Sequence, residues 1–204
     1  MTPQMKKILV WGIFGLVLFM IASSGCGSYN NMVTMDEGVT AQWQQVENQY
    51  QRRMDLIPNL VNTVQGYADF EKSTIIAVTE ARASVGQVKI DPAHLDQASI
   101  QKFQQAQDNL GSAVSRLLVV AEKYPELKAN QNFLELQAQL EGTENRITTA
   151  RKDYNDAVYS YNLKVRRFPG NIAAGFFGFT AMKQFESTKG AETAPKVDFE
   201  TTSS

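Results

Sequence analysis

The sequence has very little of the side-chain chemistry that disulfides, metal sites and nucleophilic active sites need. Among its 204 residues there is one cysteine, Cys26, and one histidine, His94. A single cysteine excludes a disulfide within the chain, and one histidine cannot supply the two Glu-x-x-His pairs of a carboxylate-bridged metal site in a helical bundle. Glycine-rich phosphate loops, G-x-S-x-G and metal-ligand spacings are also missing from the sequence. We therefore expect no metal, no cofactor and no enzymatic activity.

An excess of positive charge is missing as well. The chain has 20 basic and 21 acidic side chains, which gives a formal net charge of −1. Because nucleic-acid binding depends on a basic surface that neutralises phosphates, we expect no nucleic-acid partner. His94 lies near Asp91 and Asp96 in an expected loop, and we interpret it as a solvated side chain rather than a ligand or base.

Charged residues are absent from residues 8–22, an apolar run that follows two lysines and precedes several small residues. This order is typical of a bacterial export signal. The run is shorter than the roughly 20 residues that a bilayer core requires. Cys26 follows it where bacterial lipoproteins carry their lipid, although Ser23 stands where that motif favours leucine. Residues 1–26 are predicted to be an uncleaved membrane anchor, a lipoprotein signal with lipidation at Cys26, or an ordinary cleaved signal.

The charges near this run also predict an orientation. Lys6 and Lys7 precede the run, and the next basic residue is Arg52. By the positive-inside rule the N-terminus lies in the cytoplasm, and the rest of the chain lies on the extracytoplasmic (periplasmic) side of the bacterial cell membrane. A lipoprotein would place the chain on the same side.

Apolar residues recur at helical spacing through most of the remaining chain. After a linker at residues 27–35, they predict a first helix over about 36–85. We expect that helix to bend at Pro58, because a proline inside a helix removes a backbone donor. A second helix is expected over about 99–123 and a third over about 130–167.

The resulting fold class is all-α. The sustained alternation of three-residue and four-residue steps indicates an elongated antiparallel bundle or coiled coil. Three long helices are expected, and the kink in the first gives three to four bundle helices. The bundle domain covers residues 36–186 and ends in a short apolar helix or hook at 171–186. Residues 187–204 have few apolar side chains and are predicted to be a disordered tail.

Several sequence runs, in a fixed order, resemble the signature of the LemA family. They are Gln51-Arg52-Arg53-Met54-Asp55-Leu56-Ile57-Pro58-Asn59-Leu60-Val61, Gly66-Tyr67-Ala68, the run from Ala121 to Ala129, Thr143-Glu144-Asn145-Arg146-Ile147, Ala150-Arg151-Lys152-Asp153-Tyr154-Asn155 and Tyr161-Asn162. The resemblance covers residues 29 to about 186, and Cys26 lies outside it. It implies a bacterial, membrane-anchored, all-helical bundle without an established enzymatic activity.

Polar residues on the expected helices are the candidates for interaction. Four of them form a ridge beside the apolar stripe of the third helix: Glu144, Arg151, Asn155 and Asn162. On the first helix Arg53 lies near the centre of the apolar stripe, whereas Arg52 and Asp55 point away. Two interpretations remain open. These groups either set the helix register through buried or half-buried hydrogen bonds, or form a docking surface for another protein.

The second helix is expected to end beside residues 61–65 of the first, and the third is then expected to run back toward the far end of the first. These helix lengths leave residues 36–57 without an antiparallel neighbour. The segment nevertheless has an apolar stripe that includes Trp43 and Tyr50. Either the chain folds back at Pro58 and this segment becomes a fourth helix of the bundle, or the segment pairs with another copy or a partner near the membrane. The second alternative makes Trp43 and Tyr50 an interface, with Arg52 and Asp55 on its rim.

These features lead to a hypothesis about function. We interpret the chain as a membrane-anchored helical scaffold or adaptor of the bacterial cell envelope. Its expected partners are the membrane together with other envelope proteins or a second copy of itself. The alternative is a carrier that binds a small apolar or lipid ligand in the core of the bundle.

Overall fold

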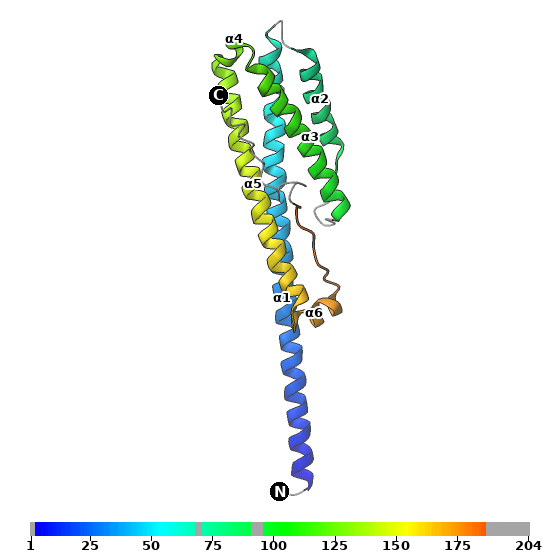
Figure 1. The fold of residues 1–204 in the computed structure, drawn as a ribbon. Helices are drawn as coiled ribbons and strands as arrows, with labels where there is room; N and C mark the ends of the chain where they lie inside the picture. Colours follow the sequence, from blue (N-terminus) through cyan, green and yellow to red (C-terminus); the bar gives the residue numbers. More distant parts are fainter. Residues whose placement is uncertain (1–2, 68–70, 91–95, 187–204) are drawn as a thin grey trace, which may run out of the picture.

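The computed structural model describes residues 3–67, 71–90 and 96–186, and these residues contain no β-strand. The helices in chain order are α1 (Pro3–Gln65), α2 (Lys72–Gln87), α3 (Gln97–Ala121), α4 (Pro125–Lys128), α5 (Gln131–Arg166) and α6 (Gly170–Phe177). Figure 1 shows α1, α2, α3 and α5 running alternately up and down, with the short α4 between α3 and α5 at one end. The expected all-α antiparallel bundle is therefore confirmed for the described residues.

The four long helices associate as two pairs, in which α1 lies along α5 and α2 lies along α3. The pair of α1 and α5 is the longer one, since α5 contains 36 residues and is about 54 Å long at about 1.5 Å per residue. From its start near the C-terminal end of α1, α5 runs down beside α1 to α6 (Figure 1). The lower part of α1 continues beyond the bundle toward the N-terminus.

The apolar stripe on the lower half of α1 is covered by the chain's own α5. Buried α1 residues Val39, Trp43, Val46 and Tyr50 belong to one cluster with α5 residues that follow the same helical spacing, Ile147, Ala150, Tyr154, Val158, Tyr161 and Val165. Both alternatives for residues 36–57 are therefore wrong: the segment neither folds back nor depends on another chain. Because residues 36–85 were expected as one helix and form parts of two, α1 and α2, the third expected helix was placed in the wrong direction.

The missing helix arises from the end of α1. The expected first helix over 36–85 is instead two helices. α1 passes through Pro58 without ending and stops at Gln65, and α2 begins at Lys72. Gly66 and Tyr67 then form a turn. Residues 27–35, expected as a linker, are helical and belong to α1.

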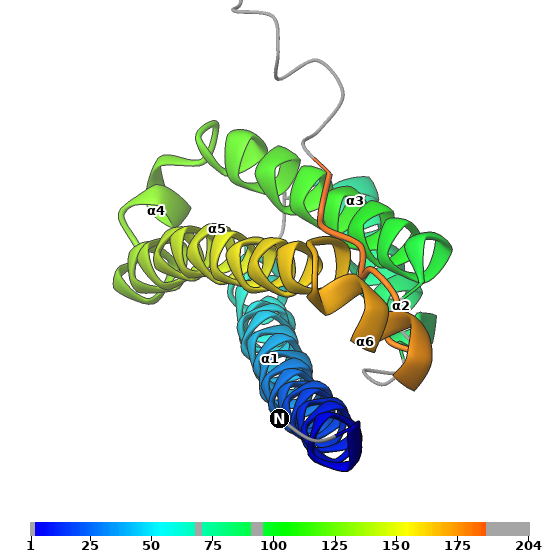
Figure 2. The same ribbon diagram turned by 90° about the horizontal axis from the view of Figure 1, so that it is seen from below.

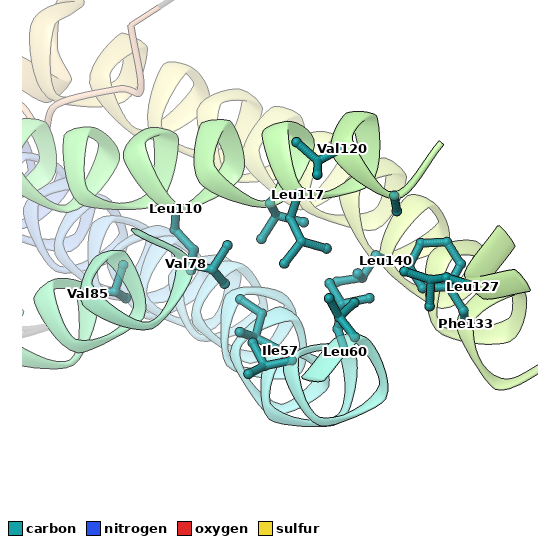
Figure 3. Packing of buried hydrophobic residues seen from close by; sticks show 14 of the residues in the cluster. Ile57, Leu60, Val78, Val85, Leu110, Leu117, Val120, Leu127, Phe133 and Leu140 are labelled. Carbon is teal, nitrogen blue, oxygen red and sulfur yellow. The ribbon is translucent and has the colours of Figure 1, made fainter. Parts of the chain in front are cut away.

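The interior of the bundle consists of two apolar clusters stacked along its long axis. The upper cluster includes Ile57, Leu60, Leu110, Leu117 and Leu140 (Figure 3). The lower one surrounds Trp43 and the aromatic residues of α5. Between them lies a polar layer in which Arg53 of α1 and Gln107 of α3, both buried, meet Glu144 of α5.

The chain after α5 returns along the bundle. Gly178 ends α6 in the left-handed conformation, with φ 81°, which glycine adopts without strain. Residues 179–186, which we call the C-terminal segment, contain no helix and run back up beside α5 (Figure 1). The expectation of a short apolar helix or hook at 171–186 is confirmed. The tail expected at 187–204, and His94 in its loop, lie outside the described residues.

Among the residues whose side chains the structure describes, no helix is both long enough and apolar enough to cross a membrane. Most of the apolar run at 8–22, and Cys26, lie outside that set.

Candidate functional site

Two asparagines of α5 hold the C-terminal segment. Asn162 donates from Nδ2 to the carbonyl of Met182 at 2.9 Å, and its Oδ1 accepts from the N–H of Met182 at 2.8 Å. Asn155 makes the same pair of hydrogen bonds with Phe185, at 3.2 and 2.9 Å. Each carboxamide therefore bonds both main-chain polar groups of one residue, as a neighbouring strand does in an antiparallel sheet.

The spacing of the two asparagines matches the spacing of the residues that they bind. Asn155 and Asn162 are seven residues apart, which places them about 10.5 Å apart along the helix axis. Met182 and Phe185 are three residues apart, which corresponds to about 10 Å in an extended chain. The matched spacing lets both asparagines bond the backbone of the same extended segment.

Phe185 is the side chain that anchors the segment, and it is 5% exposed. Its ring stacks on Trp43, with centroids 5.6 Å apart and an interplanar angle of 12°, and meets the edge of Tyr154 at 5.4 Å. The guanidinium of Arg151 lies 4.8 Å from the same ring, within the range of a cation–π interaction. Tyr154 also donates its hydroxyl to the carbonyl of Lys183 at 2.9 Å. Burial raises the pKa of Tyr154 to about 12.

The segment lies between α3 and α5, and Glu186 contacts both helices. The carbonyl of Glu186 accepts from Gln104 of α3 at 3.2 Å and from Arg151 of α5 at 3.3 Å. Its carboxylate Oε1 accepts from Gln97 of α3 at 2.9 Å. Figure 2 shows the segment running between these two helices. We call the space between α3 and α5 the α3/α5 groove; its lower half is filled by the C-terminal segment.

The upper half of the α3/α5 groove is an open cleft of about 700 Å³. Its lining begins one helical turn beyond Gln104, at Gln107, and reaches Arg53 of α1. The apolar side chains in the lining are buried or half-buried: Val114, Leu118 and Leu140. The acidic side chains are exposed and form the rim: Asp108, Glu141 and Glu144. The cleft therefore offers an apolar floor and an acidic rim.

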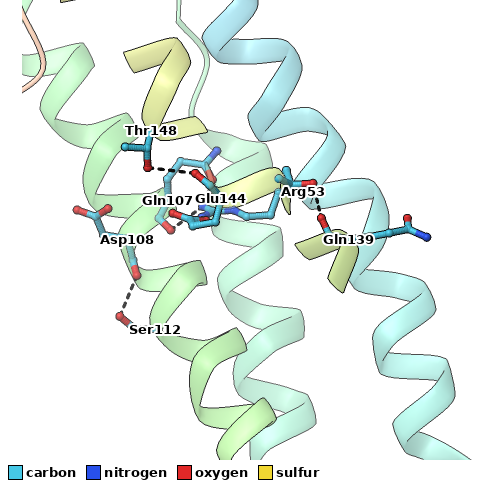
Figure 4. Close-up of polar contacts among 8 residues, drawn as sticks. Arg53, Gln107, Asp108, Ser112, Gln139, Glu144 and Thr148 are labelled. Carbon is cyan, nitrogen blue, oxygen red and sulfur yellow. Dashed lines mark hydrogen bonds and ion pairs between the residues drawn. The ribbon is translucent and has the colours of Figure 1, made fainter. Parts of the chain in front are cut away.

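Arg53 lies at the inner end of this cleft and is 5% exposed. It donates from Nη1 to Glu144 at 3.0 Å and from Nη2 to the carbonyl and the Oε1 of Gln107 at 2.8 and 2.6 Å (Figure 4). Its guanidinium also lies 5.2 Å from the ring of Tyr50. Because Glu144 balances the charge of Arg53, the carboxylates of Asp108 and Glu141 leave the cleft with a net negative charge.

The structure separates the predicted interaction residues into three groups. Trp43 is 0% exposed and Tyr50 is 3% exposed, so their assignment to an interface with another chain is wrong: α5 and the C-terminal segment already cover them. Arg52 and Asp55 are exposed, and Asp55 accepts from Gln51 at 2.7 Å. Cys26, the predicted lipidation site, lies outside the residues whose side chains are described.

Arg53 and the predicted ridge on α5 line the α3/α5 groove. Arg53 and Glu144 meet in the open cleft. Arg151, Asn155 and Asn162 contact the C-terminal segment. The lower part of the ridge is therefore occupied by the C-terminal segment of the same chain.

Some groove residues were not predicted from the sequence. Gln107 was missed because a buried glutamine at an apolar position has no recognisable signature. Phe185 was missed because it lies after the last periodic helix, where helical spacing cannot show which side chains are buried. Within the described residues, no group of three or more His, Cys, Asp or Glu side chains could hold a metal ion.

A sequence model of the LemA family matches residues 42–199. The chain belongs to the LemA family. The matched range contains Arg53, both asparagines of the ridge and the whole C-terminal segment, so the α3/α5 groove lies within the LemA domain.

Relatives of this LemA-family chain include magnetosome proteins. Two proteins named MamQ from Paramagnetospirillum magneticum are each 28% identical over 183 residues, covering 81% of this chain and 67% of the relative. The MamQ of Magnetospirillum gryphiswaldense is 26% identical over 182 residues, with the same coverage. A protein named LemA from Metamycoplasma hominis is 22% identical over 179 residues, covering 84% of this chain and 78% of that relative.

Proposed function

We propose that this LemA-family protein is a membrane-attached adaptor of the bacterial cell envelope that binds an extended segment of another protein in the α3/α5 groove. One observation carries the proposal: the lower half of the groove already holds an extended segment through its backbone. The open cleft continues the same groove, since its lining starts one turn beyond Gln104, which contacts Glu186. A partner segment in the cleft would extend this mode of binding.

The cleft also defines the chemistry of the partner. Its floor at Val114, Leu118 and Leu140 suits apolar side chains that alternate along an extended chain. The carboxylates of Asp108 and Glu141 on the rim suit lysine or arginine side chains between them. Opposite charges at a rim favour correct pairing and speed association more than they add affinity. The partner segment is therefore extended, with apolar and basic residues alternating.

Two synthetic peptides of equal length test this proposal, one alternating valine with lysine and one alternating valine with glutamate. Binding to the full chain is measured by fluorescence anisotropy at low and high salt. We expect the basic peptide to bind and its affinity to fall with salt, because exposed charges are screened. If neither peptide binds, or if the acidic peptide binds as well as the basic one, the proposed partner chemistry is wrong.

A pair of charge-reversal variants locates the binding site. Asp108→Lys with Glu141→Lys reverses the rim of the cleft, and we expect it to abolish binding of the basic peptide. Glu126→Lys with Glu135→Lys makes the same change in net charge at exposed positions outside the cleft and should leave binding unaltered. Equal loss in both variants would show that the peptide responds only to net charge.

Membrane attachment is the second part of the proposal, and it rests on the apolar run at residues 8–22 with the preceding lysines. The run attaches the chain either by crossing the membrane or by lipidation at Cys26, with the bundle on the extracytoplasmic side. Metabolic labelling with a fatty acid distinguishes these routes. Label that disappears in Cys26→Ser indicates lipidation. An unlabelled chain that stays in the membrane fraction at full size indicates a spanning anchor.

The alternative of an apolar-ligand carrier has no specific observation in its favour. Large side chains fill the two apolar clusters, and the clefts at the surface include charged and amide side chains in their linings. The relatives are named for the magnetosome or for the family itself, and neither name assigns a reaction or a ligand.

A further inference from the structure

The base of the bundle carries a group of exposed apolar side chains on and beside α6. Phe176 is 83% exposed, Ile172 is 64% exposed and Phe168 is 78% exposed. Ile172 and Phe176 are four residues apart and share one face of α6, on the side opposite the buried Ala174. Figure 2 looks at the bundle from the N-terminal end and shows α6 at the base, not covered by any other labelled helix. We call these three side chains the basal patch.

The position of α6 is fixed relative to α1. Gly170 packs against both α5 and α1. A Cβ atom there would be 2.3 Å from the carbonyl oxygen of Lys164 in α5, which only glycine permits, and 3.4 Å from the methyl group of Met32 in α1. At the other end of α6, the ring of Phe177 lies 4.7 Å from that of Tyr29 in α1. The basal patch is therefore held at the level of Tyr29.

This level is close to the end of the apolar run. Tyr29 lies seven residues after Ala22 on the same continuous helix, a distance of about 10 Å. The headgroup region outside the hydrocarbon core is about 5–8 Å thick on each side of a bilayer. If the chain is instead lipidated at Cys26, Tyr29 lies three residues, or about 5 Å, from the lipid-bearing residue. Either route of attachment places the patch at the membrane surface.

We infer that α6 docks on the lipid surface and inserts the side chains of the basal patch between the lipid headgroups. Phenylalanine is one of the apolar residues that interfacial helices direct toward the lipid. Arg166 and Arg167, both exposed in the adjoining end of α5, add positive charge that anionic headgroups attract. The carboxylates of Asp36 and Glu37 on α1 oppose part of that charge. This inference rests on the proposed membrane attachment but is independent of the α3/α5 groove.

Docking at this second point would orient the bundle. A single helix that emerges from a membrane leaves a bundle free to tilt. Contact at both α1 and α6 restricts the tilt and holds the α3/α5 groove at a defined height above the lipid.

Tryptophan quenching by brominated phospholipids tests the inference on the full chain in vesicles of phosphatidylethanolamine and phosphatidylglycerol. Phe176→Trp places a reporter on the basal patch. Leu134→Trp places a matched exposed reporter near the far end of α5. The unsubstituted chain provides the baseline, since its Trp43 is buried in the bundle and its Trp11 lies within the apolar run.

We expect the emission added by Phe176→Trp to be shifted to shorter wavelength and strongly quenched by the brominated lipids. The emission added by Leu134→Trp should resemble that of tryptophan in water and remain unquenched. Equal, unquenched emission at both positions overturns docking of α6. If the chain nevertheless sediments with the vesicles in that experiment, membrane attachment stands and only the inference about α6 is wrong. If the chain stays in the supernatant, both are wrong.

Discussion

Arg82 of α2 donates from Nε to the main-chain carbonyl of Met54 in α1, at 3.3 Å. In an unbroken helix this carbonyl would accept a hydrogen bond from the N–H of residue 58, but Pro58 has no N–H to donate. The side chain of a neighbouring helix thus replaces the missing donor. The replacement explains why α1 continues to Gln65 and does not end at Pro58.

The first prediction is a coupling between Arg82 and Pro58. Arg82→Met should destabilise the chain by about 1–2 kcal/mol, because it leaves the Met54 carbonyl without a partner. In a Pro58→Ala background the helix provides its own donor, and the same change should have a much smaller effect. Chemical denaturation of the two single variants and the double variant measures this coupling. Equal effects in both backgrounds would show that the hydrogen bond to Met54 does not contribute to stability. Arg116→Met, on the exposed surface of α3, is the control and should have little effect in either background.

The second prediction concerns the stripe on the lower half of α1. Trp43→Glu with Tyr50→Glu should abolish cooperative unfolding, because two uncompensated charges would be buried under α5 at several kcal/mol each, against a typical total stability of about 5–15 kcal/mol. Circular dichroism during heating measures the result. A cooperative melt like that of the parent chain would place the stripe at an interface between chains after all. Arg52→Glu, at an exposed neighbouring position, should melt normally.

The third prediction concerns the two asparagines that hold the C-terminal segment. Asn162→Leu should accelerate hydrogen exchange of the Met182 amide, and Asn155→Leu that of the Phe185 amide, because each change removes the acceptor of that N–H. The bundle should lose only about 1–3 kcal/mol for the two hydrogen bonds removed in each variant. Exchange is followed residue by residue with NMR. Unaltered exchange at Met182 and Phe185 would contradict the proposed role, and Asn145→Leu on the exposed face of α5 is the matched control.

The fourth prediction is a loss of stability at high pH. Burial raises the pKa of Tyr154 and of Tyr161 to about 12, whereas an unfolded chain has tyrosine pKa values of about 10. Between these values the unfolded chain releases protons that the folded chain keeps. The contribution of these two tyrosines to the free energy of unfolding is therefore fully present below about pH 10. It falls toward pH 12, by up to about 1.4 kcal/mol per pKa unit for each group.

Melting temperatures measured from pH 8 upward test this dependence. Tyr161→Phe should make the decline between about pH 10 and 12 shallower, because one titrating group is removed. Tyr159→Phe, which alters an exposed tyrosine, should leave the slope unaltered. A parent chain that is equally stable across this range would show that the buried hydroxyls do not titrate as the structure indicates.

Local periodicity in the sequence was sufficient for the helical class and for most helix boundaries. The second expected helix, 99–123, agrees with α3 within two residues, and the third, 130–167, agrees with α5 within one. The same periodicity placed Glu144, Arg151, Asn155 and Asn162 on one edge of a helix. This follows from helix geometry alone, since 3.6 residues per turn determines which side chains share a face.

Only the tertiary structure decided what covers each face. Whether Pro58 ends a helix depends on Arg82, which is distant in sequence and supplies the missing donor. Whether Trp43 is a core residue or an interface residue depends on the direction in which α5 runs. The partners of Asn155 and Asn162 lie 20 to 30 residues away in a segment without periodicity. Helix periodicity is a local property of the chain, whereas the pairing of faces depends on contacts between residues far apart in sequence, and these form only when the whole bundle packs.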